Sequence, residues 1–185
     1  MLIAVLGLNG SGKDSVADRI AEKYSFKKIS LSDIVREEAK SRGLDPRDRD
    51  NLNAVSEELR KKEGPDYLMK RVLKGYSGGN LVLSSFRHPS EVELVKANKG
   101  IVVKVTAGQK VRFERVSKRF KLGGAHGTDS FEDFVRKEER ELKNPDPDRM
   151  QIAQCLALSD YEIDNSGSFG ELYKKIDLFM ESINR

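Results

Sequence analysis

The sequence is poor in cysteine and histidine and has no long hydrophobic run. Its single cysteine, Cys155, cannot form an internal disulfide, and with two histidines no cluster has the spacing of zinc ligands. The longest apolar runs, such as residues 2–8, are far shorter than the roughly 18 residues that a membrane-spanning helix needs. We therefore expect neither a disulfide scaffold, nor a zinc domain, nor a membrane partner, and we predict a reducing, cytoplasmic location.

A strong excess of charge is also missing. The chain has 34 Lys and Arg against 30 Asp and Glu, a net charge of +4, and these residues are dispersed. A clustered basic stripe that grips nucleic acid is absent, so we expect no nucleic-acid partner and a small anionic ligand instead. A length of 185 residues, against a prior of about 150 per domain, predicts one domain over residues 1–185. The sequence carries no signal for the oligomeric state.

What is present is an alternation of two hydrophobic patterns. Short apolar runs rich in β-branched residues predict strands at 2–6, 26–30, 81–84, 101–105 and 161–163. Between them, apolar positions repeat every three or four residues and predict helices before Tyr24, from Ser32 or Asp33 to Arg42, around 52–64, and over 65–74 and 169–184. Strands that are apolar on both faces and separated by helices are typical of a parallel sheet covered on both sides. The predicted class is α/β with five parallel strands.

The most informative stretch is Gly7–Asp14, which reads G-L-N-G-S-G-K-D and fits the pattern G-x-x-x-x-G-K. It directly follows a predicted strand and precedes an amphipathic helix. Glycine lets the backbone turn tightly around a phosphate, and the helix N-terminus adds its positive dipole end. The stretch therefore predicts ATP binding by Gly7, Asn9, Gly10, Ser11, Gly12 and Lys13, with Lys13 bridging the β- and γ-phosphates.

The position after the lysine departs from the usual Ser or Thr, because it holds Asp14, and a hydroxyl follows as Ser15. Asp14 could bind Mg²⁺ through water. Alternatively, it could cap the helix while Ser15 serves the metal and a phosphate, which is the alternative that helix-capping preferences favour.

These residues carry a family resemblance. The segment Gly12–Ser15 is similar to G-K-G-T of adenylate kinases and G-K-D-T of phage-type deoxynucleoside monophosphate kinases, and residues 29–36 resemble the adenylate kinase stretch I-S-T-G-D-x-L-R. Residues 82–87 fall where adenylate kinases have D-G-F-P-R, and Arg115 and Arg119 match their paired lid arginines in spacing. The chain thus resembles the P-loop nucleoside monophosphate kinase superfamily, and looks closest to adenylate kinase-related and dephospho-coenzyme A kinase-like proteins of archaea.

The resemblance implies a three-layer α/β/α P-loop kinase fold with a small lid and with ATP and Mg²⁺ as cofactors. It implies that Arg36, with Asp33, binds the acceptor within a helical insertion at 31–75, and that Arg87 reaches both phosphates. A lid region at 112–142 would carry Arg115 and Arg119 as catalytic residues, and its glycine-rich flap is Gly123–Gly127. The backbone around Asn165 would wrap the adenine, although a simple turn is an equally natural interpretation of this segment.

One departure concerns the metal. Related kinases end the third strand with an acidic residue that holds Mg²⁺ through water, whereas this chain has Ser84. Either Asp14 compensates, which we favour because the source of the neutralising charge is flexible, or the protein is a nucleotide-binding switch without efficient turnover.

The charged helices allow plainer interpretations. Arg36, Arg115 and Arg119 each have spacings that also suit surface ion pairs. Arg136 and Arg140 lie among glutamates and are predicted to form such pairs. His88, His126 and Cys155 are predicted to have no catalytic or metal role, and Cys155 to be buried.

The acceptor is predicted from register. A phosphate acceptor is ionised at neutral pH, since its second pKa is about 6, and needs no general base, whereas a hydroxyl acceptor needs a carboxylate beside it. Asp33 is the obvious candidate, but it lies three residues before Arg36, as in adenylate kinases, and not four as in dephospho-coenzyme A kinases. The sequence therefore predicts phosphoryl transfer to a nucleoside or deoxynucleoside monophosphate, with a hydroxyl acceptor as the alternative.

Overall fold

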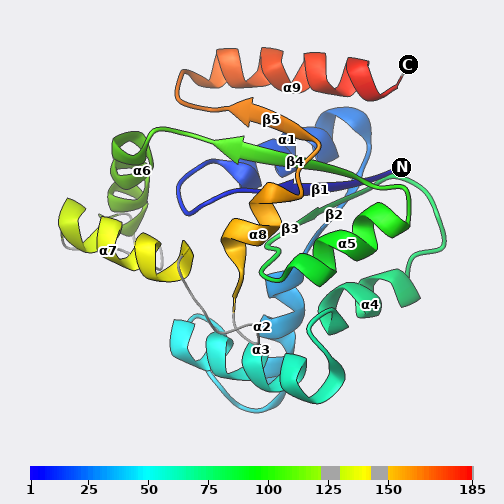
Figure 1. Cartoon of the computed structure of the whole chain (residues 1–185), viewed down its shortest axis with the longest axis vertical. Helices are drawn as coiled ribbons and strands as arrows, with labels where there is room; N and C mark the ends of the chain where they lie inside the picture. Colours follow the sequence, from blue (N-terminus) through cyan, green and yellow to red (C-terminus); the bar gives the residue numbers. More distant parts are fainter. Residues whose placement is uncertain (122–129, 143–149, 185) are drawn as a thin grey trace.

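Five parallel strands form the centre of the structure, in the spatial order β2-β3-β1-β4-β5 (Figure 1). The computed structural model describes residues 1–121, 130–142 and 150–184. The strands are β1 (Leu2–Leu6), β2 (Lys27–Ser30), β3 (Leu81–Ser84), β4 (Ile101–Thr106) and β5 (Tyr161–Asp164). All neighbouring strands run parallel. The predicted five-stranded parallel sheet is confirmed, and β2 begins one residue later than expected.

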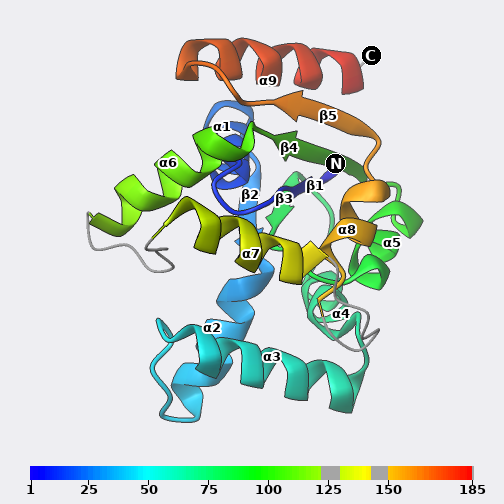
Figure 2. The same ribbon diagram turned by 60° about the vertical axis from the view of Figure 1, so that its left-hand side comes forward.

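The two faces of the sheet are covered by different helices. One face packs against α1 (Lys13–Tyr24) and α9 (Phe169–Ile183), and the other against α4 (Tyr67–Lys74), α5 (Pro89–Ala97) and α8 (Ile152–Ala157). The predicted three-layer α/β/α arrangement is therefore confirmed. The remaining helices are α2 (Leu31–Ser41), α3 (Arg49–Glu63), α6 (Gln109–Lys121) and α7 (Phe131–Leu142). Figure 2 shows α2 and α3 at the opposite end of the molecule from α9.

Strand β1 shows how the sequence makes both faces apolar. Its side chains alternate, so that Ile3 and Val5 belong to the core cluster under α1 and α9, while Leu2, Ala4 and Leu6 belong to the cluster on the other face. All five are buried. A central strand without a polar side can only be accommodated between two helical layers, which explains the continuous apolar run.

Further helices follow the carboxyl ends of the strands, and the roles predicted for regions 31–75 and 112–142 stay predictions. Helices α2, α3 and α4 lie within the 31–75 insertion, and α2 begins directly at the end of β2. Helices α6 and α7 pack against each other, and α6 begins at Gln109, before the predicted lid boundary at 112. The predicted flap Gly123–Gly127, together with His126, lies outside the described residues. Among the described helices, none combines the length and the apolar character that crossing a membrane requires.

Two neighbouring positions of α9 test how this helix is seated. Ile176 is fully buried against the sheet, whereas Leu178 is 65% exposed. Ile176→Ala should lower the free energy of unfolding by about 2–5 kcal/mol because it leaves a cavity. The control Leu178→Ala should change that free energy by less than about 0.5 kcal/mol. Denaturant unfolding measures both, and equal effects would mean that α9 is seated differently.

Candidate functional site

The glycine-rich turn between β1 and α1 adopts the backbone conformation of a phosphate loop. Gly10 and Gly12 have positive φ angles of 79° and 90°, which L-residues rarely adopt. A Cβ atom on Gly10 would lie 2.5 Å from the backbone oxygen of Arg112, and one on Gly12 would overlap the side-chain nitrogen of Asn165. The turn is therefore closed against two other segments, and both positions need glycine for space as well as for conformation.

Asn165 has a clear role in holding this turn. The residue is buried, its amide nitrogen donates a hydrogen bond to the Ser11 backbone oxygen at 2.8 Å, and its backbone N–H donates to the Thr106 oxygen at 2.7 Å. The sequence prediction placed Asn165 beside the adenine. In the structure its side chain holds the phosphate loop through the hydrogen bond to the Ser11 backbone.

Lys13 begins α1 at the rim of this turn. Its side chain is 17% exposed, and its ammonium group lies 3.7 Å from the Asp14 carboxylate. Burial lowers the pKa of Lys13; the Asp14 charge opposes this shift, whereas the nearby Arg87 and Arg119 add to it. Several cationic groups therefore influence one another here.

Asp14 does not cap α1. The N-cap residue is Gly12, with no side-chain cap hydrogen bond, and Asp14 lies in the first turn. The capping hypothesis for Asp14 was wrong because the turn ends on a left-handed glycine one residue before Lys13, so that the carboxylate reaches toward the lysine instead. The Asp14 side chain is 54% exposed.

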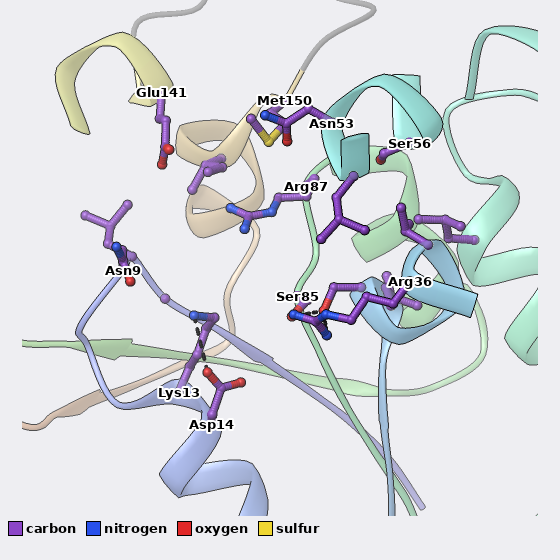
Figure 3. Close-up of a pocket in the computed structure, with 18 of the residues that line it drawn as sticks. Asn9, Lys13, Asp14, Arg36, Asn53, Ser56, Ser85, Arg87, Glu141 and Met150 are labelled. Carbon is purple, nitrogen blue, oxygen red and sulfur yellow. Dashed lines mark hydrogen bonds and ion pairs between the residues drawn. The ribbon is translucent and has the colours of Figure 1, made fainter. Parts of the chain in front are cut away.

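A cavity of about 220 Å³ opens beside Lys13 (Figure 3). Its wall combines residues from the phosphate loop, from α2 and α3, from the segment after β3, and from α6, α7 and α8. Its polar and charged lining residues include Asn9, Lys13, Asp14, Ser32, Arg36, Asn53, Ser56, Arg60, Ser85, Arg87, Arg119 and Glu141. Figure 3 shows Arg87 between Asn9 and Lys13 on one side and Arg36 on the other. Cations thus converge on one space from five separate segments of the chain.

On the α2 side of the cavity, Arg36 is held by its own helix. Its guanidinium donates to Asp33 Oδ1 at 2.6 Å and to Ser32 Oγ at 3.0 Å. Ser32 continues into a hydroxyl cluster with Ser30 and Ser85. Arg36 therefore makes the predicted surface pair and still lines the cavity, whereas Asp33 is not among the described lining residues.

The two arginines of α6 that were predicted to serve the lid have different surroundings. Arg119 lines the cavity and donates to Asn9 Oδ1 at 3.0 Å. Arg115 donates to the backbone oxygen of Asn165 at 2.8 Å and is not among the cavity-lining residues that the structure describes. Of this predicted pair, only Arg119 is brought to the cavity, while Arg115 joins α6 to the loop that supports Ser11.

The end of β3 carries the substituted metal position. Ser84 is fully buried next to β1, in register with Val5, and its hydroxyl has no hydrogen-bond partner among the described residues. Sequence reasoning correctly placed this residue at the strand end. Ser15, in the first turn of α1, is half-buried.

The remaining predictions concern residues with structural roles. Cys155 is buried, and burial raises the pKa of its thiol to about 12. His88 caps α5, because its ring nitrogen accepts the Ser90 N–H. Arg136 is exposed and pairs with Asp133 at 2.5 Å, as predicted for a surface pair, and Arg140 is also exposed.

Sequence reasoning missed the contribution of α3. Asn53, Ser56 and Arg60 all line the cavity, and their spacing of three and four residues places them on one side of the helix. The apolar positions Leu52, Val55 and Leu59 drew attention to the core-facing stripe, although the polar stripe beside it carried an equally regular signal.

Comparison with known proteins agrees with this geometry. A family model described as an AAA domain matches residues 6–127, which include the phosphate loop. A UPF0200 protein of Thermococcus sibiricus is 31% identical over 99% of this chain and 95% of its own length, and one of Thermococcus gammatolerans is 33% identical over 100% and 96%. This chain belongs to the UPF0200 family. Further UPF0200 members similar to it occur in Methanosarcina, such as that of Methanosarcina barkeri at 32% identity over 94% and 90%.

Solved structures extend the comparison to the fold. Shikimate kinase from Bacteroides thetaiotaomicron has a TM-score of 0.64 at 13% identity, with coverage of 100% of this chain and 99% of that enzyme. Shikimate kinase from Acinetobacter baumannii, solved in complex with shikimate, has a TM-score of 0.58 at 18% identity, covering 98% and 92%. The UPF0200 chain therefore has the fold of these P-loop kinases, and the fold that the resemblance implies is confirmed.

The closure of the phosphate loop on Asn165 can be tested with two glycine variants. Gly12 and Gly78 have similar positive φ angles of 90° and 99°, but only at Gly12 does an added Cβ meet another residue. Backbone strain of about 1–3 kcal/mol applies to alanine at either position. We expect Gly12→Ala to raise the dissociation constant for ATP by more than about tenfold, a change of at least 1.4 kcal/mol. Calorimetric titration of Gly78→Ala should give the wild-type constant, and an equal loss in both variants would contradict the proposed role of the contact.

Proposed function

We propose that this chain is an ATP- and Mg²⁺-dependent kinase that transfers the γ-phosphoryl group to a nucleoside or deoxynucleoside monophosphate. The observation that carries the proposal is the placement of cations on opposite walls of one cavity. Lys13 lies on the phosphate-loop side, Arg36 lies on the α2 side, and Arg87 lies between them (Figure 3). A cavity that offers cations to two separate anions suits a triphosphate and an acceptor phosphate bound together.

Each residue then has a defined task. The amides of the phosphate loop bind the β- and γ-phosphates, and Lys13 stabilises the charge on the group in transfer. Arg36 binds the acceptor phosphate, and Arg87 contacts both substrates. Arg119 extends from α6 toward the phosphates, and Asn9 of the phosphate loop accepts a hydrogen bond from it. Arg115 joins α6 to the loop that carries Asn165 and to the Gly10 backbone oxygen of the phosphate loop.

The acceptor proposal rests on Asp33. A hydroxyl acceptor requires a carboxylate beside it as general base. Asp33 is engaged with the Arg36 guanidinium at 2.6 Å and is not among the described residues that line the cavity. A phosphate acceptor attacks as an oxyanion without such a base. Asp33 is therefore not placed as that base, which favours a phosphate over a hydroxyl acceptor such as dephospho-coenzyme A. The carboxylates among the described lining residues, Asp14 and Glu141, belong to α1 and α7 and not to the acceptor-side helices.

Oxygen donors suitable for Mg²⁺ are present beside the phosphate loop. No group of three or more His, Cys, Asp or Glu side chains that could hold a metal occurs in the described part of the chain. Nucleotide-bound Mg²⁺ does not need one, since it takes one or two protein ligands plus phosphates and waters. The exposed carboxylate of Asp14, which lines the cavity, fits that requirement. Ser15, the next residue of α1, is not among the described lining residues, and its hydroxyl would be the second ligand. When bound, Mg²⁺ would neutralise charge on the phosphates.

One assay tests the proposal as a whole. The purified protein is incubated with Mg²⁺-ATP and, in turn, with each of the common nucleoside and deoxynucleoside monophosphates, with dephospho-coenzyme A and with shikimate. A monophosphate kinase forms ADP and a second diphosphate only when its acceptor is present. Slow ADP formation that is independent of every acceptor would instead identify a nucleotide-binding switch, and transfer to dephospho-coenzyme A or shikimate would identify a hydroxyl acceptor.

The roles of Lys13 and Arg36 can be told apart by the transfer rate and the KM values of single variants. Lys13→Ala should reduce transfer by at least about 10²-fold, because a preorganised charge on the transferring group is lost. Arg36→Ala should raise the KM for the acceptor by about 10- to 100-fold, as expected for a lost charge-assisted hydrogen bond, and leave the KM for ATP unchanged. Arg47→Ala is the matched control, because Arg47 pairs with Asp45 on the surface and is 87% exposed. Unchanged transfer in Lys13→Ala would refute the mechanism.

The compensation of Ser84 by Asp14 predicts a change in metal dependence. Asp14→Asn removes the carboxylate that we assign to Mg²⁺, so half-maximal transfer should require several-fold more Mg²⁺. The control is Asp18→Asn. Asp18 lies one turn further along α1 and pairs with Lys28, so this variant should need the same Mg²⁺ concentration for half-maximal transfer as the wild type. Identical titrations of the Asp14 variant and the wild type would rule out this assignment.

A further inference from the structure

A fully buried carboxylate lies behind the cavity and has no part in the mechanism above. Glu91, in the first turn of α5, is 0% exposed. A buried carboxylate is costly unless it is paired and hydrogen-bonded. The hydrogen-bond partners of Glu91 therefore indicate its role.

The two oxygens of Glu91 serve two different segments. Oε2 accepts the backbone N–H groups of Arg87 at 2.9 Å and His88 at 3.2 Å. Oε1 accepts a hydrogen bond from Nη2 of Arg60, on α3, at 2.8 Å. One carboxylate thus joins the segment that carries Arg87 to the helix that forms the opposite part of the cavity wall.

A capping role alone does not explain this arrangement. Glu171 occupies the same position in the capping box of α9, where its carboxylate accepts the N–H of Ser168. Glu171 is exposed, whereas Glu91 is buried and paired with a buried arginine. Capping a helix does not require burial, so the burial of Glu91 reflects its second partner.

The second partner belongs to the cavity. Arg60 is 8% exposed, its other terminal nitrogen donates to Ser56 Oγ, and both residues line the cavity. Its Nε has no hydrogen-bond partner among the described residues, so the contacts with Glu91 and Ser56 fix the guanidinium. The position of Arg60 depends on Glu91.

The backbone of Arg87 is held on both sides. Its N–H donates to Glu91, and its carbonyl oxygen accepts the N–H of Gln151 at 2.8 Å. The turn that leads into it includes Ser85 at a φ of +69°, a conformation that a non-glycine residue keeps only when its surroundings enforce it. Glu91 supplies part of that enforcement.

We propose that Glu91 is a positioning residue for phosphoryl transfer, which fixes the Arg87 backbone and, through Arg60, ties the acceptor-side helix α3 to it. The proposal rests on the function proposed above and extends it to a residue that touches neither substrate. Arg87 and α3 would then keep one relative position while the acceptor binds, so that the acceptor meets the transferring phosphate in line.

The test is Glu91→Gln, with Glu171→Gln as the matched control. Glutamine has one acceptor oxygen and one amide, so it can serve the Arg87 backbone or Arg60, but not both. We expect kcat for acceptor-dependent transfer to fall by about 10²-fold, as for a misplacement near 1 Å. The dissociation constant for ATP should change much less than kcat, since the loop amides and Lys13 that bind the triphosphate are not among the groups that hydrogen-bond to Glu91. The Glu171 variant should match wild type in both quantities.

A second measurement does not depend on the acceptor. Amide hydrogen exchange at Arg87 and His88 should become faster in Glu91→Gln, while the control variant leaves these two amides unchanged. Unchanged exchange would overturn the proposal even if the substrate of the enzyme were different from the one proposed. Failure of the wild-type protein to transfer phosphate to any monophosphate would instead count against the proposed function.

A double variant covers the case in which the single variant is too unstable to assay. Arg60→Met with Glu91→Gln removes both buried charges, and such neutral replacements are often tolerated. We expect this double variant to fold. Its dissociation constant for ATP should change much less than its kcat, and its kcat should be lower than that of the wild type because α3 is no longer tied to Arg87. Wild-type kcat in the folded double variant, or in folded Glu91→Gln, would show that the pair only stabilises the fold.

Discussion

The structure depends on holding several cations close together in one cavity. Lys13, Arg36, Arg87 and Arg119 share a space of about 220 Å³, and their mutual repulsion opposes this arrangement until an anionic ligand is bound. The effect is visible at Lys13, whose pKa is lowered by burial and further by Arg87 and Arg119. Each cation therefore needs a support of its own: Asp14 lies beside Lys13, Asp33 pairs with Arg36, and Asn9 accepts from Arg119.

Two further ion pairs, both largely buried, join the helices on either side of the cavity. Arg60 and Glu91 join α3 to α5, and Arg112 and Glu138 join α6 to α7. The second pair also has a link to the phosphate loop, because the Arg112 backbone packs against Gly10 and its Nε donates to the Ala107 oxygen at 2.9 Å. Burying such pairs gives little net stability compared with apolar residues, but breaking one is costly. We infer that the two ion pairs fix the positions of the helices on the acceptor side and on the α6 side of the same cavity.

The sequence predicted what local pattern determines and missed what long-range packing determines. The phosphate loop, the five parallel strands and the position of Arg87 just past β3 follow from short motifs and from short continuous apolar runs between helical repeats. Helix α8 is short, and α5 buries only Glu91, Val92 and Val95, so neither gave a clear periodic signal. The pairing of Arg60 with Glu91, the support of Ser11 by Asn165, and the Gly12 cap that excludes Asp14 from capping are contacts or backbone angles that no spacing rule specifies.

The distribution of carboxylates connects these features to the chemistry. Ser84 leaves the end of β3 without a charge, Glu91 is neutralised behind the wall by Arg60, and Asp33 is turned onto Arg36. Within the part of the chain that the structure describes, the carboxylates that line the cavity are Asp14, beside the phosphate loop, and Glu141 of α7. An acceptor pocket arranged in this way offers positive charge and hydroxyl groups but no carboxylate on α2 or α3 to take a proton. That arrangement suits an acceptor that arrives already ionised, which is the physical reason for favouring a phosphate.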